Sequence, residues 1–267
     1  MHGHSIFSDG ADDPGKFPAY CENNGVEVFA LCDHDTTEGT DSAKEASKGS
    51  GVKFIPGIEI SCINGIHMLG LGIDHRNKAL VAELDRVRIM HAKRAAKIVR
   101  VLEKNDFKID HSVLVKDKGV ITVFEVFRAI IYSPDPFYDR NSQKSFSEFS
   151  KKWIYKDSPY YEYLKIERMT LKQAIDLIHK ANGVAVWAHP AHTLRKRMDQ
   201  MDDLGNELKK LGLDGIEVFS SKHNKEQTIM VLELTDRLDL VPSAGSDFHG
   251  YGAQEIGGWK LHGLVFN

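Results

Sequence analysis

The sequence predicts an α/β protein, a distorted (β/α) barrel with a small helical insertion domain. Two observations carry this prediction. Short apolar runs typical of strands alternate with helical segments, which is the order found in parallel sheets covered by helices. Histidine and carboxylate residues follow most of these runs directly, and barrel enzymes build their active sites at the carboxyl ends of the strands. We therefore expect the chemistry to lie at one end of the barrel.

The first predicted strands lead into candidate ligands. Residues 26–31 form a β-rich run that ends shortly before His34. Residues 52–55 form a second run, which continues toward Glu59. A short return strand that begins at His67 predicts a hairpin, and this hairpin would make His67 a neighbour of Glu59.

The later part of the chain repeats this pattern. Residues 170–182 predict an amphipathic helix that opens with a capping box, and a buried strand over residues 184–187 then ends at His189. A strand over residues 215–219, a helix over residues 225–238 and a strand over residues 240–242 follow. Asp247 and His249 come after the last of these strands and close the series.

The alternation stops in the middle of the chain. A long helix is predicted over residues 85–105 and a second over residues 123–131, and an aromatic, charged stretch follows. We therefore expect residues 85–169 to form a helical insertion that caps the substrate. Residues 1–84 and 170–267 would form the barrel that holds the metal site.

Composition excludes several classes of protein. The 267 residues carry a net charge of -3, from 38 acidic and 35 basic residues, which gives no field for wrapping long nucleic acid. No apolar run reaches the roughly 18 residues of a membrane span, and the first residues show neither the basic n-region nor the apolar h-region of a signal peptide. We therefore expect a cytoplasmic protein with no membrane partner. Three cysteines without a CxxC pair disfavour a disulfide framework or a thiolate zinc site.

Nine side chains are candidate metal ligands, and they explain a large share of the 13 histidines. They are His2, His4, Asp9, His34, Glu59, His67, His189, Asp247 and His249. A single HxH pair occurs by chance in a chain this rich in histidine, but the other donors recur at predicted strand ends. Six imidazoles and three carboxylates suit two or three divalent ions such as manganese, zinc or iron. We therefore expect a cluster of such ions as the cofactor.

Five short motifs carry a family resemblance. They are His2-Gly3-His4 with Ser8-Asp9-Gly10, Asp33-His34-Asp35, Gly57-Ile58-Glu59-Ile60-Ser61 with His67, Ala188-His189-Pro190, and Gly245-Ser246-Asp247-Phe248-His249-Gly250. Their order resembles that of the PHP (polymerase and histidinol phosphatase) domain family, metal-dependent phosphoesterases with a distorted seven-stranded barrel. The resemblance covers nearly the whole chain. The branch it suggests acts on nucleoside monophosphates, 3',5'-bisphosphates or short RNA 5' ends.

The resemblance implies how the ligands divide among the ions. One ion would be held by His2, His4, Glu59 and Asp247, a second by Asp9, His34 and His249, and a third by Glu59, His67 and His189. Glu59 would bridge two ions. The implied reaction is hydrolysis of a phosphomonoester, in which a metal-bridged hydroxide attacks phosphorus while cations neutralise the nonbridging oxygens. No protein nucleophile is needed.

Basic residues near two of the motifs are candidate substrate contacts. Arg195 follows the AHP motif, and Lys222 and His223 follow the strand over residues 215–219; all three are expected to contact phosphate, although a solvated loop explains Arg195 equally well. As an alternative to phosphate contact, His223 would protonate the leaving oxygen if it lies within reach. The predicted catalytic set is Asp247, His249, His223 and Arg195.

Two features depart from the family pattern. The family usually has a strand and an Asp-Leu pair before HxH, whereas here only Met1 precedes His2, so we expect either that the first strand is missing or that the start is misassigned. The suggested branch often carries an Arg-Pro-His phosphate-binding motif in its insertion, and the corresponding region here contains Glu125. An acidic residue there would repel phosphate unless Arg128 takes the place of the missing cation.

These inferences predict an enzyme that hydrolyses a phosphomonoester of a small substrate, a nucleoside 5'-monophosphate or 3',5'-bisphosphate. Two alternatives stay open. A 5'-3' exonuclease acting on short oligonucleotides predicts release of mononucleotides, and a noncatalytic metal-binding module predicts tight metal binding without turnover. An amidohydrolase ranks last, because the bridging lysine usual in such enzymes has no counterpart in this sequence.

Overall fold

The chain consists of two compact units. The computed structural model describes residues 2–195 and 197–250. The first unit comprises Met1–Glu83 and Arg168–Asn267, and the second comprises Leu84–Glu167. The part of the barrel predicted over residues 251–267 lies outside the described residues. Among the residues that the structure describes, no helix combines the length and the apolar character needed to span a bilayer.

A curled seven-stranded sheet forms the centre of the first unit. Its strands are β1 (His2–Gly3), β2 (Val28–Leu31), β3 (Lys53–Ser61), β4 (His67–Leu71), β7 (Val184–Trp187), β8 (Gly215–Ser220) and β9 (Val241–Gly245), in that spatial order. The sheet curls enough for its two edges to meet, since Gly3 and Phe248 form a parallel bridge and the His4 amide donates to the Phe248 carbonyl at 2.7 Å. This mixed α/β architecture is consistent with the predicted distorted barrel.

Strand β4 makes the sheet mixed rather than fully parallel. It pairs antiparallel with β3, with Ser61 opposite His67, and antiparallel with β7, with Leu69 opposite Val186. The other neighbours in the sheet are parallel. The hairpin predicted behind Glu59 is therefore present. Because β4 runs in reverse, its first residue lies at the same edge as the carboxyl ends of the parallel strands.

The first strand, expected to be missing unless the start is misassigned, is present as a strand of two residues. His2 and Gly3 form β1 and pair in parallel with Ala30 and Leu31 of β2. Local sequence gives little sign of a two-residue strand, because most of what holds it comes from partners far along the chain. Among these partners is the segment after β9, where the Phe248 amide faces the His2 carbonyl at 3.5 Å.

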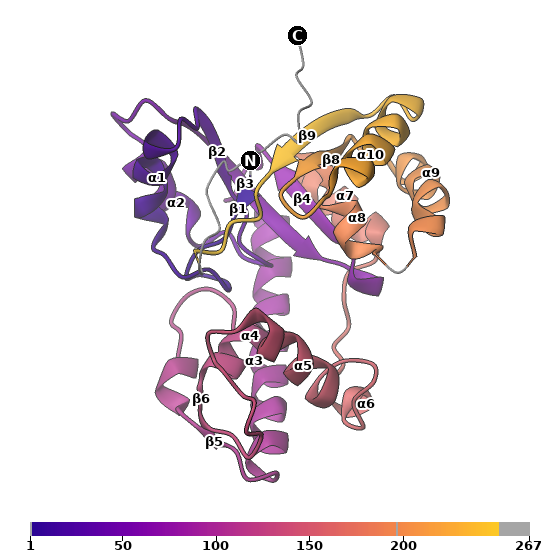
Figure 1. Cartoon of the computed structure of the whole chain (residues 1–267). Coiled ribbons are helices and arrows are strands. Elements are labelled where there is room, and N and C mark those ends of the chain that lie inside the picture. The colour runs from indigo at the N-terminus through magenta and orange to yellow at the C-terminus, as the bar shows by residue number, and fades with distance from the viewer. Residues whose placement is uncertain (1, 196, 251–267) are drawn as a thin grey trace. The chain divides into compact units, whose positions relative to one another are not determined.

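Helices flank both halves of this sheet, as Figure 1 shows. They are α1 (Phe17–Asn23), α2 (Thr40–Ala46), α7 (Leu171–Lys180), α8 (Pro190–Thr193), α9 (Met201–Leu211) and α10 (Lys225–Arg237), with short 3-10 turns at Pro14–Lys16, Ile63–Gly65 and Met198–Gln200. The capping box predicted for α7 is present, with the Thr170 amide donating to Gln173 at 2.9 Å. The left-handed residue that follows the helix is Asn182, at φ 59°, rather than a glycine.

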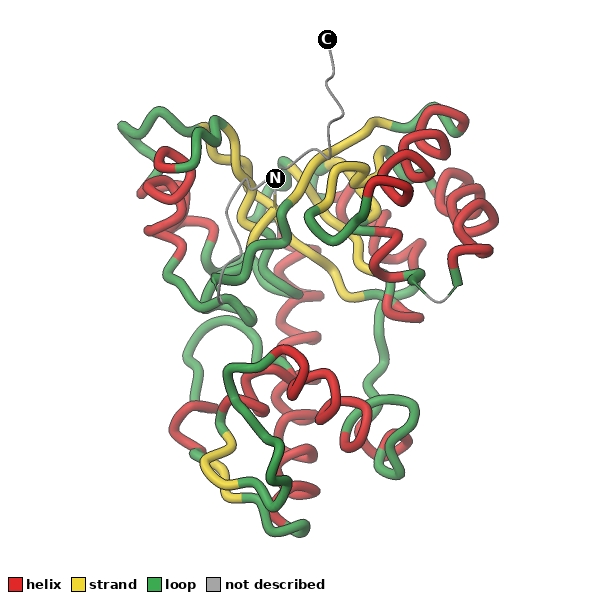
Figure 2. Tube along the Cα trace, in the orientation of Figure 1, coloured by secondary structure: helices red, strands yellow, loops and turns green. Residues whose placement is uncertain are grey.

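The second unit is mainly helical (Figure 2). It contains most of α3 (Lys78–Glu103), which begins in the first unit, together with α4 (Val123–Arg128), α5 (Gln143–Trp153), α6 (Tyr161–Leu164) and a 3-10 turn at His111–Leu114. The helix predicted over residues 123–131 is too long, because Ile130–Tyr132 forms β6 and pairs with β5 (Lys108–Ile109). Apolar spacing alone does not separate the end of a helix from a short β-branched strand.

Glu125, the acidic residue expected at a phosphate contact, caps α4 instead. Its carboxylate accepts a hydrogen bond from the Thr122 amide at 2.8 Å, and the Thr122 hydroxyl accepts one from the Glu125 amide. Lys116 pairs with the same carboxylate. The capping box and the ion pair give this negative charge a structural role.

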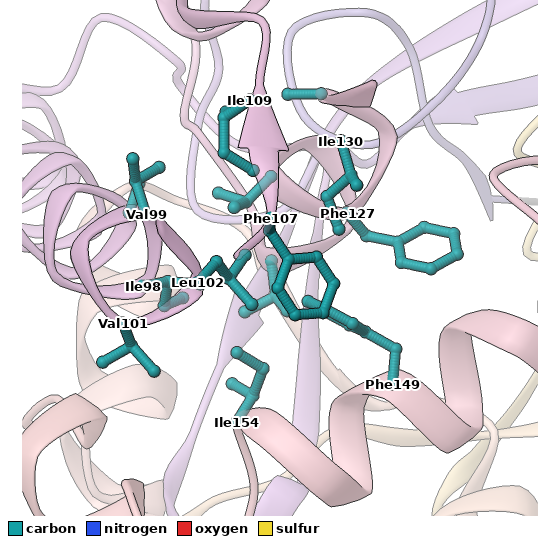
Figure 3. Packing of buried hydrophobic residues seen from close by; sticks show 14 of the residues in the cluster. Ile98, Val99, Val101, Leu102, Phe107, Ile109, Phe127, Ile130, Phe149 and Ile154 are labelled. Carbon is teal, nitrogen blue, oxygen red and sulfur yellow. The ribbon is translucent and has the colours of Figure 1, made fainter. Parts of the chain in front are cut away.

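Aliphatic side chains make up most of the buried core of the second unit, and Phe107, Phe127 and Phe149 pack among them, as Figure 3 shows. The Phe127 ring is fully buried, and its centre lies 5.2 Å from that of Phe149. Phe107 meets Trp153 edge to face at the same separation. Aromatic pairs of this geometry add to the stabilisation that burial of their surface provides.

We expect Phe127→Ala to destabilise the second unit by about 3–5 kcal/mol, because it removes a large buried ring and leaves a cavity. Urea denaturation followed by far-UV circular dichroism measures the change. Phe137→Ala is the matched control, since Phe137 is 83% exposed and its loss should change the unfolding free energy by less than about 0.5 kcal/mol. Equal effects of the two substitutions would contradict this account of the core.

Candidate metal centre

The nine predicted ligands converge at one edge of the sheet in the first unit. β1 and the loop after it carry His2, His4 and Asp9; His34 follows β2, Glu59 lies in β3, His67 begins β4, His189 follows β7, and Asp247 and His249 follow β9. Residues separated by more than two hundred positions therefore become neighbours. The His2 and Asp247 side chains, for example, approach to 3.2 Å.

Three overlapping groups of side chains each present ligand atoms within 4.8 Å of one another. They are His2, His4, Glu59 and Asp247; His4, Asp9, His34 and His249; and His34, Glu59 and His67. The division implied by the family resemblance differs at two points. His4 belongs to two groups, and His34 rather than His189 completes the third. His189 still lies beside that group, with its Nε2 atom 3.0 Å from Glu59 Oε1.

The donor atoms of these groups fit divalent cations. Among the described residues, both ring nitrogens of His4, Oδ1 of Asp9, Nδ1 of His34 and Oε2 of Glu59 are buried without a hydrogen-bond partner. Buried polar atoms normally find partners, because leaving them unpaired costs free energy. Imidazole nitrogens and carboxylate oxygens around a shared centre are the ligands that manganese, zinc and iron bind. Such ions would satisfy these atoms together.

Opposite charges within the cluster shift the pKa values of its side chains. Burial alone would raise the pKa of Glu59, but the surrounding imidazoles, His34 and His67 first among them, hold it well below its usual range. Burial would likewise lower the pKa of His2, yet the charge of Glu217 and hydrogen bonds to Asp247 and Glu217 raise it to about 10. A metal ion binds neutral imidazole, so it must displace this proton. We therefore expect metal affinity to rise with pH.

Glu217 was not predicted from sequence, although it supports two of the ligands. This fully buried carboxylate accepts a hydrogen bond from Nδ1 of His2 at 2.7 Å and another from the His189 amide at 2.9 Å. The first bond leaves Nε2 of His2 facing the cluster. Carboxylates that orient ligating histidines in this way set the ring position and raise its basicity. The sequence signal that could have identified Glu217 is its position as an acidic residue within an otherwise apolar strand.

Asp33 holds the loop that carries the first ligands. Its carboxylate accepts hydrogen bonds from the Ser5 amide and hydroxyl, both at 2.7 Å, and from the Ser8 hydroxyl at 2.6 Å. The loop between His4 and Asp9 is thereby tied to the end of β2. The first residue of the Asp-His-Asp motif thus positions the loop, and the histidine after it joins the cluster.

Two ligands adopt backbone conformations that non-glycine residues rarely populate. His189 has φ 28° and Asp247 has φ 51°. Left-handed conformations at such residues cost free energy and persist where the surrounding structure holds them. The hydrogen bond from the His189 amide to Glu217 is one such restraint.

The predicted substrate contacts have different surroundings. Lys222 is partly buried, and its ammonium nitrogen lies 3.5 Å from Oδ2 of Asp247. Arg195 is exposed on the loop after α8. Arg128 belongs to the second unit, where its guanidinium carbon lies 6.0 Å from the centre of the Phe124 ring.

His223 has no ring nitrogen available for acid catalysis in this structure. Its Nδ1 atom donates to the Val218 carbonyl at 3.0 Å, and Nε2 accepts a hydrogen bond from the Ala191 amide at 3.3 Å. Burial also lowers its pKa, which favours the neutral ring. Its contacts hold the first turn of α8, directly after His189.

His192 lies near the cluster although the sequence gave no reason to select it. Its ring centre is 5.8 Å from that of His189. Burial, followed by the charges of His189, Lys222 and Arg195, lowers its pKa to about 4. The ring is therefore neutral at physiological pH and able to donate one hydrogen bond.

The comparison with known families agrees with this arrangement of ligands. Residues 1–211 match the model of the PHP domain, and the chain belongs to the PHP domain family. The predicted family is thus confirmed.

Curated relatives align along almost the full length of the chain. It is 32% identical to a 5'-3' exoribonuclease of Haemophilus influenzae over 93% of this chain and 89% of that protein. It is 29% identical to a 3',5'-nucleoside bisphosphate phosphatase of Chromobacterium violaceum over 96% and 90%, and 28% identical to a phosphoribosyl 1,2-cyclic phosphate 1,2-diphosphodiesterase of Eggerthella lenta over 94% and 93%.

Solved structures extend the agreement to the fold. A structure described as an amidohydrolase from Chromobacterium violaceum with bound sulfate is 28% identical and superposes with a TM-score of 0.81, covering 96% of this chain and 88% of that one. A structure described as that of a metal-dependent phosphoesterase from Bifidobacterium adolescentis superposes with a TM-score of 0.79 and 28% identity, covering 94% of this chain and 87% of that one. The predicted enzyme class, a phosphoester hydrolase, is confirmed by the relatives, and the chain is a hydrolase of this family.

We expect Gly245→Ala to weaken metal binding by about 10- to 100-fold, the usual cost of disturbing the groups that orient metal ligands. A Cβ at this position would lie 1.7 Å from Oε1 of Glu217 and 2.6 Å from Nδ1 of His2, so the pair must separate. Isothermal titration of manganese into chelator-treated protein measures the affinity. Gly51→Ala is the control, because a Cβ there meets no atom within 4 Å. Unchanged affinity in Gly245→Ala would contradict the role of Glu217.

Proposed function

We propose that this hydrolase removes phosphate from a nucleotide, either a nucleoside 5'-monophosphate or a 3',5'-bisphosphate. The observation that carries the proposal is the convergence of six imidazoles and three carboxylates at one edge of the sheet, several of them with buried nitrogen or oxygen atoms that lack a hydrogen-bond partner. The 29% identical relative named as a 3',5'-nucleoside bisphosphate phosphatase supports this choice of substrate class.

Two or three divalent ions, manganese, zinc or iron, would be held by the nine ligands. When bound, these ions would act as Lewis acids that polarise the phosphoryl group and lower the pKa of a water molecule. Glu59 is the bridging residue in this proposal, because it belongs to two of the three groups and is fully buried. Asp247 and His249 would complete the site from the segment after β9.

The residues of the chain itself supply the positive charge that phosphate requires. The ammonium group of Lys222, 3.5 Å from Asp247, would neutralise a nonbridging oxygen of the substrate. Arg195 would add charge from the exposed loop, and the neutral His192 ring would donate one hydrogen bond. His223 would position α8, through its contact with the Ala191 amide, rather than transfer a proton.

Hydrolysis at the 5' end of a short oligonucleotide is the second candidate function. It is favoured by the 32% identical relative named as a 5'-3' exoribonuclease. The same ligand cluster would serve a phosphodiester, so the two candidates differ in the product released. The phosphatase releases inorganic phosphate, and the exonuclease releases mononucleotides.

The first experiment measures metal content and turnover on the same sample. Protein purified without chelator is analysed for bound metals and assayed with manganese on nucleoside 5'-monophosphates, 3',5'-bisphosphates and short oligonucleotides. We expect two or more equivalents of metal, release of inorganic phosphate, and loss of both in Asp247→Ala. Metal binding without turnover on any substrate would instead support a noncatalytic module, and mononucleotide release alone would support the exonuclease.

We expect Lys222→Ala to lower kcat/KM for the best nucleotide by about 10- to 100-fold, the loss of one charge-assisted contact with phosphate. Lys222→Arg should restore part of the activity, because the charge is kept. Lys225→Ala, at the exposed start of α10, is the matched control and should leave kcat/KM within about twofold. Steady-state kinetics decide between these results, and equal values for Lys222→Ala and Lys225→Ala would remove Lys222 from the site.

A further inference from the structure

The charges of the chain are divided unequally between its two units. Residues 84–167 hold 17 lysines and arginines against 12 acidic residues, whereas the rest of the chain holds 18 against 26. With histidines counted as neutral, the second unit carries +5 and the remainder carries -8. The overall charge of -3 conceals this separation. A unit with excess positive charge attracts polyanions.

Four of these cations form a basic stripe along α3. The stripe consists of Lys93, Lys97, Arg100 and Lys104. Their spacing of four, three and four residues places them on one face of the helix, about 16 Å from end to end. The opposite face carries Ile98 and Leu102, which are buried in the core of the unit. The side chains of the stripe therefore lie on the surface and do not pack in the hydrophobic core of the unit.

The cations of the stripe are available to a ligand. Lys93, Arg100 and Lys104 are exposed and Lys97 is partly exposed. Within residues 2–195 and 197–250, none of the four forms a salt bridge with a carboxylate. Glu103, the acidic residue next to Lys104 in the chain, pairs with His111 at 2.9 Å instead. In the part of the chain that the structure describes, no carboxylate pairs with the cations of this face.

Aromatic rings lie beside the stripe. The ammonium nitrogen of Lys97 is 4.9 Å from the centre of the Tyr163 ring and donates to the Tyr163 carbonyl at 3.1 Å. Arg94 donates to the Leu164 carbonyl at 3.0 Å, and its guanidinium carbon is 6.0 Å from the centre of the Tyr155 ring. Tyr163 is 47% exposed and Tyr155 is 44% exposed. Two half-exposed rings are thus fixed next to a row of cations.

We propose that this face of α3, with Tyr163 and Tyr155, binds single-stranded nucleic acid. Cations that follow a phosphate backbone and rings that stack on successive bases are the combination that such ligands require. Unpaired bases expose the ring faces that tyrosines stack on, whereas a duplex buries them, so the surface favours a single strand. It contains none of the candidate metal ligands and goes beyond the proposed nucleotide hydrolysis.

The test measures binding to a 12-residue oligouridylate carrying a 3' fluorophore, by fluorescence anisotropy, with the full chain in EDTA so that no hydrolysis occurs. The stripe variant replaces Lys93, Lys97, Arg100 and Lys104 with Gln. The charge-matched control replaces Lys44, Lys172, Lys209 and Lys210, all exposed in the first unit, with Gln. We expect the stripe variant to bind at least tenfold more weakly, with the slope of log affinity against log salt reduced by about 3, and the control to change less than twofold.

Tyr163 provides a second test that leaves the charges in place. Tyr163→Phe keeps the ring and should bind as the parent does, whereas Tyr163→Leu should lose about tenfold in affinity because stacking is removed. Lys97 keeps its contact in both variants, since it donates to the backbone carbonyl. Thermal melts by circular dichroism establish that each variant is folded.

Three results would overturn the proposal. One is equal weakening in the stripe variant and the charge-matched control, which would indicate bulk attraction only. Another is unchanged binding in both the stripe variant and Tyr163→Leu. The third is stripe-dependent binding to phosphatidylserine vesicles with none to the oligonucleotide, which would assign the face to a membrane. Hydrolysis of a mononucleotide is measured separately with manganese, so failure of the phosphatase proposal leaves this test intact.

Discussion

The first unit depends on one buried carboxylate. Glu59 is fully buried in β3, and its two oxygens meet Nε2 of His4 at 3.0 Å, Nδ1 of His67 at 2.9 Å and Nε2 of His189 at 3.0 Å. These histidines come from three different places in the sheet. A charge in this position has a high desolvation cost unless cations surround it. The curled sheet, the reversed strand β4 and the bridge between its edges all bring partners to this carboxylate.

Sequence reasoning succeeded where the signal is local. The helix α7 has its capping box, apolar spacing and stop within a dozen residues, and its bounds were predicted closely. The hairpin behind Glu59 was also predicted, because its two strands lie close together in the chain. The two-residue strand β1 and the start of β6 were not predicted, since each depends mainly on pairing with a distant segment. Pairing partners are not encoded in local spacing.

The same distinction separates the ligands from their supporting residues. The nine candidate ligands stand in short motifs, most of them at predicted strand ends, so local sequence was enough to select them. Glu217 supports His2 across 215 positions of sequence, and Gly245 leaves the space that this pair occupies. Nothing near Gly245 in the chain indicates that a methyl group there would strike a carboxylate. His223 was selected for its place in the chain, yet its two hydrogen bonds give it a structural role.

The net charge of -3 argues against the wrapping of long nucleic acid, but this charge is not spread evenly over the two units. Much of the negative charge lies in the first unit, where Asp9, Glu59 and Asp247 are directed into the cluster and would be neutralised by the metals they bind. Screening confines the field of exposed charges to about 10 Å at ordinary ionic strength. A polyanion near the second unit therefore responds to the local excess of cations, not to the sum over the chain. The net charge of each unit and each surface, rather than that of the whole chain, therefore decides whether a polyanionic ligand is excluded.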